Sequence, residues 1–74
     1  MMLEKVKELL VEELQINPDD ITMDASLSKD LGINSIELAD LIMLCEEKFD
    51  IEISEDDSND FNTVGDVVNY LENL

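Results

Sequence analysis

The chain passes from a loop into a helix in the stretch Leu31-Gly32-Ile33-Asn34-Ser35-Ile36-Glu37-Leu38, and the rest of the sequence is organised around this corner. Gly32 accepts a backbone conformation with positive φ that a Cβ would oppose. Asn34 or Ser35 can accept a hydrogen bond from one of the N–H groups that open the following helix. Glu37 stands three residues after Asn34, as in a capping box. The pattern predicts a serine hydroxyl near solvent, at the positive end of a helix dipole.

Amphipathic spacing predicts three longer helices and one short helix. The first covers residues 2–15 and stops before Pro18, which penalises a helical conformation in the residue before it. The second starts at Ser35 and runs to about residue 49. A short helix opens after Ser54 and ends near Phe61, and Thr63 caps the last helix. The residues expected on the buried faces are Leu3, Val6, Leu9, Leu10, Leu14, Leu38, Leu41, Ile42, Cys45, Phe49, Val64, Val67, Val68 and Leu71.

No period is sustained from residue 16 to residue 34, so this stretch is expected to be a long loop. Its isolated apolar residues Ile16, Ile21, Leu27 and Leu31 should hold it against the core. Long loops in small domains are more often functional than idle. The sequence therefore predicts an all-α fold, a small four-helix bundle with a long loop between the first and second helices. A length of 74 residues predicts a single domain over 1–74.

The charge is strongly acidic, with 20 Asp and Glu against 4 Lys and Arg and a net charge of −16. Nucleic acids and anionic membranes repel such a chain, so we expect neither as a partner. The charge favours soluble partners with basic patches, and on so small a body it favours a monomer. One cysteine cannot form an internal disulfide, and the N-terminus lacks the apolar run of a signal peptide. We therefore expect a cytoplasmic protein.

The residue types that support catalysis and metal binding are scarce. Serine and cysteine nucleophiles are most often activated by histidine, and the chain has no histidine. The lysines are expected on the surface and Cys45 in the core, so we predict no catalytic residue and no enzyme. Zinc lacks ligands. The segment 56–61 places Phe61 where a calcium loop needs glycine, so no dedicated metal site is predicted.

One face of the helix that begins at Ser35 should remain exposed. At about 100° per residue, two apolar and two acidic residues lie opposite the buried stripe. Single exposed apolar residues are common, but apolar anchors ringed by carboxylates also suit docking against a basic surface with an apolar hollow. The predicted partner-docking residues are Asn34, Ile36, Glu37, Asp40, Met43 and Glu47.

The stretch 30–38 resembles the attachment motif of acyl carrier proteins, which is usually written Leu-Gly-x-Asp-Ser-Leu. The resemblance continues in Asp24-Ala25-Ser26-Leu27, in 46–53 and in Thr63-Val64, and it covers essentially the whole chain. It implies that Ser35 carries a 4′-phosphopantetheine arm, installed from coenzyme A by a phosphopantetheinyl transferase, whose thiol holds acyl groups as thioesters. It also implies acyl-transferring and chain-elongating partner enzymes of fatty-acid, polyketide or specialised lipid biosynthesis.

The resemblance further implies a core that shelters acyl chains, for which small residues such as Ala39 and Cys45 are expected to leave room. Asn34 replaces the family's usual Asp, and Ile36 its usual Leu. Asn caps a helix about as well as Asp, so the first change bears on transferase docking rather than on folding. It fits a specialised carrier. Two alternatives stay open: a carrier of aminoacyl groups such as D-alanine, and an interaction module that keeps the bundle without the arm.

Overall fold

Helices form where the amphipathic spacing and the capping residues predict them. The computed structural model describes residues 1–74 and has four α-helices: α1 (Met2–Leu14), α2 (Ser35–Phe49), α3 (Glu55–Ser58) and α4 (Val64–Glu72). The prediction of an all-α fold is confirmed, since the only β-type pairing is one isolated bridge. The predicted end of the short helix was wrong. The backbone continues after Ser58 as turns to Phe61, whose N–H donates to the Ser58 carbonyl at 3.1 Å.

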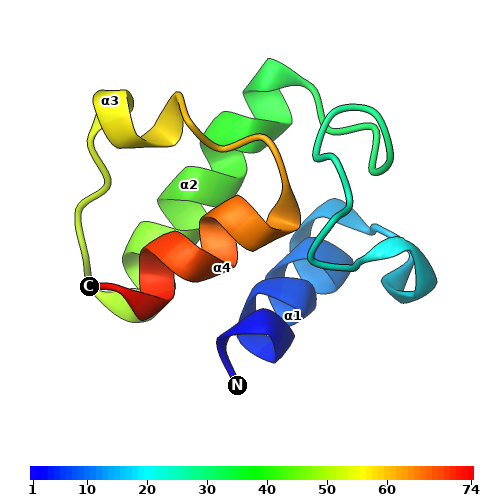
Figure 1. The fold of residues 1–74 in the computed structure, drawn as a ribbon, viewed down its shortest axis with the longest axis horizontal. Helices are drawn as coiled ribbons and strands as arrows, with labels where there is room; N and C mark the ends of the chain where they lie inside the picture. The colour runs from blue at the N-terminus through cyan, green and yellow to red at the C-terminus, as the bar shows by residue number, and fades with distance from the viewer.

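The core lies where α1 packs against both α2 and α4 (Figure 1). The predicted buried face is confirmed for α4 and for the centres of α1 and α2, whereas the stripe edges at Leu3, Leu14, Leu38, Ile42 and Phe49 are half-buried. The buried residues are Val6, Leu9, Leu10, Ile21, Ala25, Leu27, Leu31, Ile33, Leu41, Cys45, Phe61, Val64, Val67, Val68 and Leu71.

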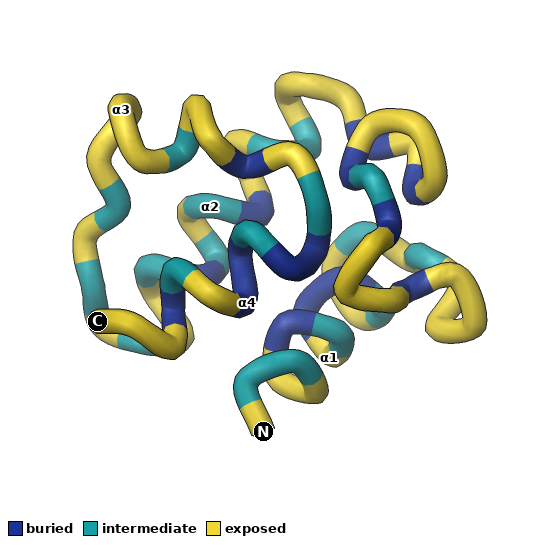
Figure 2. The backbone as a smooth tube through the Cα atoms, in the orientation of Figure 1, coloured by how far each residue is buried: buried dark blue, intermediate teal, exposed yellow.

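The loop from α1 to α2 contributes a third of this core without long regular structure. Figure 2 shows buried segments along its course, and they correspond to Ile21, Ala25, Leu27, Leu31 and Ile33. The prediction that isolated apolar residues hold the loop against the core is therefore confirmed, although Ile16 is only half-buried. One turn of the loop, Pro18–Asp20, is a 3₁₀-helix that the sequence pattern did not predict.

Backbone hydrogen bonds fasten the loop to the start of α4. Ser26 and Thr63 form an antiparallel bridge, and the Val64 N–H donates to the Ala25 carbonyl at 3.0 Å. The Gly65 N–H donates to the Met23 carbonyl at 2.9 Å. A Cβ on Gly65 would lie 2.9 Å from that carbonyl oxygen, so glycine permits this close approach. The loop is thereby held in one place relative to α4.

The expectation that Ala39 lies in the core was wrong, because this residue is exposed. Ala39 follows Ile36 by three residues and precedes Met43 by four, so helical geometry puts all three on one face of α2. That face points to solvent. Of the two small residues, only Cys45 lies in the core. None of the helices is long and apolar enough to span a bilayer.

Candidate functional site

Asn34, and not Ser35, caps α2. The Asn34 side-chain oxygen accepts a hydrogen bond from the Glu37 N–H at 2.8 Å, and the Glu37 carboxylate accepts one from the Asn34 N–H at 3.1 Å. These two bonds form a complete capping box. Ser35 is the first residue of the helix and is exposed. Its hydroxyl takes no part in the cap, which decides between the two residues that the sequence left open.

The backbone before Ser35 is fixed by the loop. Gly32 has φ 67°, a left-handed conformation that favours glycine. The buried side chains of Leu31 and Ile33 flank it on either side. The Ile33 N–H donates to the Leu27 carbonyl at 2.9 Å, so the corner is hydrogen-bonded to an earlier part of the same loop. The corner is therefore held by burial on both sides of the glycine and by this backbone bond.

A pocket of about 530 Å³ opens beside Ser35. Its apolar lining comes from the loop, from α2 and from the segment before α4, and its polar lining includes one lysine. Sequence reasoning did not predict this pocket, because Phe61 and Asn62 reach it only through the fold. The lining residues are Ser26, Leu27, Ser28, Lys29, Ile33, Asn34, Ser35, Leu38, Phe61 and Asn62.

The outward face of α2 has the character that the sequence predicts. Ile36 is 74% exposed and Met43 is 58% exposed, and Asp40 and Glu47 are exposed with them. Glu37 differs from the other predicted docking residues, because it is half-buried and its carboxylate is folded back onto the cap. A partner would therefore meet a less accessible carboxylate there than on the rest of the face.

A hollow of about 240 Å³ beside this face brings in residues that the sequence did not single out. Glu13 and Leu14, at the end of α1, line it together with Asp40, Met43 and Glu47 of α2 and with Leu44. The α1 residues were missed because periodicity describes one helix at a time. The acidic and apolar surface thus continues from α2 onto α1.

The thiol of Cys45 lies in the core and is held in its protonated form. Burial, reinforced by the negative charge of Glu46, raises the pKa of Cys45 from its ordinary 9.0 to about 11. The thiol therefore stays protonated at neutral pH, and the prediction that Cys45 packs in the core is confirmed. Lys5, Lys29 and Lys48 are exposed as expected, whereas Lys7 is half-buried.

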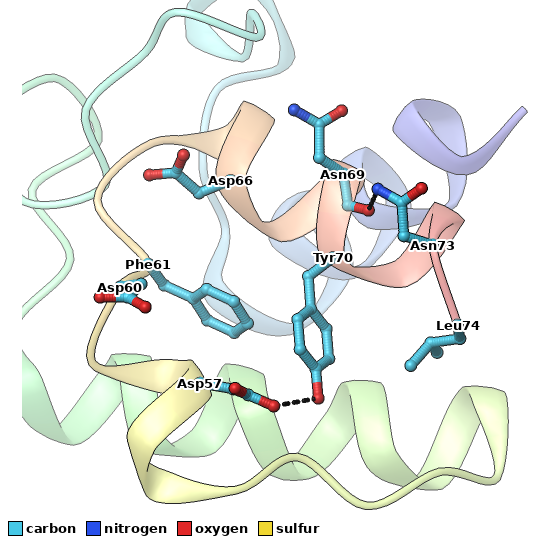
Figure 3. A pocket seen from close by; sticks show the side chains of 8 residues that line it. All are labelled: Asp57, Asp60, Phe61, Asp66, Asn69, Tyr70, Asn73 and Leu74. Carbon is cyan, nitrogen blue, oxygen red and sulfur yellow. Dashed lines mark hydrogen bonds between the residues drawn. The ribbon is translucent and has the colours of Figure 1, made fainter.

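A second surface pocket, of about 440 Å³, lies between α3 and α4 and is lined by carboxylates (Figure 3). The Tyr70 hydroxyl donates to the Asp57 carboxylate at 2.8 Å, which raises the pKa of Tyr70. The ring of Tyr70 meets Phe61 edge to face, with centroids 5.4 Å apart. Nearby, the N–H groups of Asn62 and Thr63 donate to the Asp66 carboxylate and lower its pKa.

Comparisons with known proteins agree along the chain. Residues 4–71 match a family model described as "Phosphopantetheine attachment site". The chain is 41% identical over 73 residues to an acyl carrier protein of Sulfurovum sp. (strain NBC37-1), covering 99% of this chain and 97% of that protein. It is 43% identical over 70 residues to an acyl carrier protein of Clostridium perfringens (strain SM101 / Type A), covering 95% and 92%. It is 46% identical over 67 residues to an acyl carrier protein of Chlamydia trachomatis serovar L2, covering 90% and 87%.

The bundle, the exposed serine at the start of α2 and the family match define the class of phosphopantetheine-attachment domains. The chain belongs to the acyl carrier protein family. The resemblance in the sequence is therefore confirmed, and the cofactor of the family is 4′-phosphopantetheine.

The residues around Ser35 fit the phosphodiester of that cofactor. The hydroxyl is accessible and free of the cap, and the first N–H groups of a helix have no partner within it. An anion on Ser35 would lie at the positive end of the 15-residue helix α2. Asn34 leaves the preceding position uncharged, so it adds no repulsion.

Proposed function

We propose that this chain is an acyl carrier in which the Ser35 Oγ is the attachment atom for 4′-phosphopantetheine. The observation that carries the proposal is the exposed hydroxyl of Ser35 at the first position of α2, left free because Asn34 makes the cap. When attached, the group supplies a thiol that holds acyl cargo as thioesters. The chain's own residues present it: the Asn34–Glu37 capping box and the buried Leu31 and Ile33 hold the corner in place.

The outward face of α2 is the surface on which we propose that partners dock. Its supports are the exposure of Ile36 and Met43 and the carboxylates Asp40 and Glu47 around them. Such a surface suits a basic patch with an apolar hollow. The partners would be a phosphopantetheinyl transferase and enzymes that transfer or elongate acyl groups. The carrier itself would perform no catalysis.

We also propose that residues 1–74 act as one unit, because α1, α2 and α4 share a single core. A single cysteine cannot form an internal disulfide, which suits a reducing compartment, and we propose the cytoplasm on that ground. Its charge of −16 favours a monomer.

The test is co-expression with a phosphopantetheinyl transferase, followed by intact-mass measurement. We expect the wild type to gain the mass of one phosphopantetheine and Ser35→Ala to gain none. Ser28→Ala is the matched control, because Ser28 is an exposed serine that lines the same pocket. A mass gain in Ser35→Ala would refute the site. No gain in the wild type with several transferases would refute the proposal.

Asn34→Asp tests the departure from the family motif. Asp caps a helix about as well as Asn, so stability should change little while one negative charge returns beside Ser35. We expect faster modification by a transferase that serves carriers with the usual Asp-Ser pair. The cargo is then identified by mass spectrometry of the thioester from the native host. An aminoacyl group such as D-alanine there would replace the acyl assignment, and native protein that lacks phosphopantetheine would favour an interaction module.

A further inference from the structure

The pocket beside Ser35 differs in charge from other hollows on the surface. Its lining contains no carboxylate and one cation, Lys29. Four other surface pockets are each lined by three or four carboxylates. The whole chain has 20 acidic residues and only 4 basic ones, so a wall without acids is a departure from its composition. This pocket without carboxylates lies beside Ser35, the serine that the proposed function uses.

Three carboxylates close to this pocket in sequence are each bound to backbone N–H groups. Asp30 accepts from the Ser26 N–H at 2.7 Å, and Asp66 accepts from the Asn62 N–H at 2.9 Å. Glu37 accepts from the Asn34 N–H at 3.1 Å. None of the three lines the pocket. The absence of carboxylates from the lining is therefore a product of hydrogen bonding as well as of residue choice.

The rest of the pocket suits a ligand that is charged at one end and apolar beyond it. Leu27, Ile33 and Phe61 are buried residues that form its apolar side, and the half-buried Leu38 extends it. The turn that bears Lys29 is fixed, because the Lys29 N–H donates to the Ser26 hydroxyl at 3.1 Å. A volume of about 530 Å³ lies within the usual range for small-molecule sites, roughly 300–1,000 Å³, and exceeds what a phosphate alone would fill.

We propose that this pocket holds the proximal part of the group attached to Ser35, with Lys29 as the counter-charge to its phosphodiester and Leu27, Leu38 and Phe61 in contact with the adjoining branched alkyl portion. The inference rests on the proposed attachment at Ser35. A phosphodiester adds negative charge to a chain at −16, and in this pocket it would meet a lining with one lysine and no carboxylate. The proximal half of the group is thereby held on the protein, and its distal end stays free to reach partners.

Nuclear Overhauser effects in the fully modified protein test the contact directly. We expect cross-peaks between the methyl groups of the attached arm and the side chains of Leu27, Leu38 and Phe61. Lys29→Gln removes the charge and keeps most of the side chain. These cross-peaks should weaken in this variant by about two- to fivefold, the range that the loss of an exposed charge pair gives. The ³¹P shift of the phosphodiester should move with them.

Lys48→Gln is the matched control, because it removes the same charge from an exposed lysine at the other end of α2. We expect its cross-peaks and its ³¹P shift to match those of the wild type. The inference is overturned if the modified wild type shows no cross-peaks to the pocket, or if the two lysine variants behave alike. Intact mass keeps the two proposals apart, since a chain that gains no arm refutes the attachment itself.

Discussion

The two connections that flank α2 are held in opposite ways. The loop 15–34 has almost no regular structure, yet it buries five side chains in the core and pairs with the start of α4. The connection 50–63 contains the helix α3, yet Phe61 is its only buried residue and no residue of α3 is buried. Figure 1 shows them on opposite sides of the bundle, the loop on the right and α3 on the left.

This difference shows that buried side chains, rather than regular backbone hydrogen bonds, hold a segment in place. Helix α3 itself is held by a few polar contacts, chiefly Tyr70 to Asp57, and the Ile53 N–H before it donates to the Glu46 carboxylate at 2.8 Å. Ile51 and Ile53 before the helix pack against the core as half-buried residues, and Phe61 after it is buried. Segments with few buried contacts open at low free-energy cost. We therefore expect the backbone amides of α3 to exchange with solvent sooner than those of the loop. The more firmly held connection is thus the one that leads to Ser35.

Leu27→Ala should have the largest effect, because Leu27 is 3% exposed and anchors the centre of the loop. Removing a buried leucine side chain costs about 2–5 kcal/mol of unfolding free energy. Urea denaturation followed by circular dichroism measures the loss. Ile53→Ala, a half-buried residue before α3, is the control and should cost about 1 kcal/mol. Equal losses in the two variants would contradict the comparison.

Gly65→Ala tests the fastening of the loop to α4. Alanine favours a helix over glycine by about 1 kcal/mol, so propensity alone predicts a gain. The new Cβ would lie 2.9 Å from the Met23 carbonyl oxygen, a backbone atom that can move only with the loop. We expect this clash to prevail, with a net loss of about 1–2 kcal/mol in urea denaturation. A net gain would show that the loop yields freely.

Asp66→Asn probes the junction that both connections share. The Asp66 carboxylate accepts from Asn62 and Thr63, and the pKa below its ordinary 3.8 means that the ionised form is stabilised by folding. That stability is present above pH 3.8 and is lost as pH falls through the lower folded value. The variant should lose about 0.5–1 kcal/mol of unfolding free energy near neutral pH. The loss is small because solvent screens the charge of a largely solvated carboxylate.

Acid titration of unfolding is the check on Asp66. The difference in stability between wild type and Asp66→Asn should shrink as the pH falls below 3.8. Asp56→Asn, which changes an exposed acid on α3, provides a control of equal charge. A difference that stays constant into acid would rule out this linkage.

Tyr70→Phe should have the smallest effect and a local one. It removes the hydroxyl that binds Asp57 and keeps the ring against Phe61. Amide exchange should quicken at Ser58 and Asn59 in α3 and its cap, while Leu27 and Ile33 in the loop remain protected. Faster exchange in the loop as well would contradict the independence of the two connections.

The pKa of the Tyr70 hydroxyl can be measured directly, because the chain has one tyrosine. Its hydrogen bond to Asp57 raises its pKa, so the stability from that bond is complete below the ordinary value of 10.0 and is lost as pH rises through the folded value. Ultraviolet absorbance should show the shift, and Asp57→Asn should return the titration toward 10.0. A wild-type midpoint at or below the ordinary value would be the contrary result.

Local features of the fold were predictable from sequence, and contacts between distant segments were not. The starts of α2 and α4 follow from their capping residues, and the helix faces follow from periodicity. The end of α3 was misplaced because Phe61 was read as part of the helix, whereas its burial is a tertiary contact. The pairing of Ser26 with Thr63 carries no local signal. The long-range pairing that holds the loop was therefore the least predictable part of the fold.

The candidate site was likewise predictable in its local features but not in its contacts between distant segments. The corner at Gly32 and the exposed serine follow from residue types within a few positions of one another. The pocket beside Ser35 needs Phe61 and Asn62 from beyond α3, and the hollow beside the outward face of α2 needs Glu13 from α1. The error at Ala39 arose from treating small size as a sign of burial, although its place on the helix puts it outside.

The bridge between Ser26 and Thr63 affects when the protein can fold during its synthesis. It closes a loop that contains all of α2 and α3, and such closure costs chain entropy before any contact offsets it. A nascent chain is synthesised from its N-terminus, so Ser35 is made well before the residue that completes its support. The corner reaches its final form only after Thr63 has left the ribosome, and an enzyme that acts on the folded corner must wait until then.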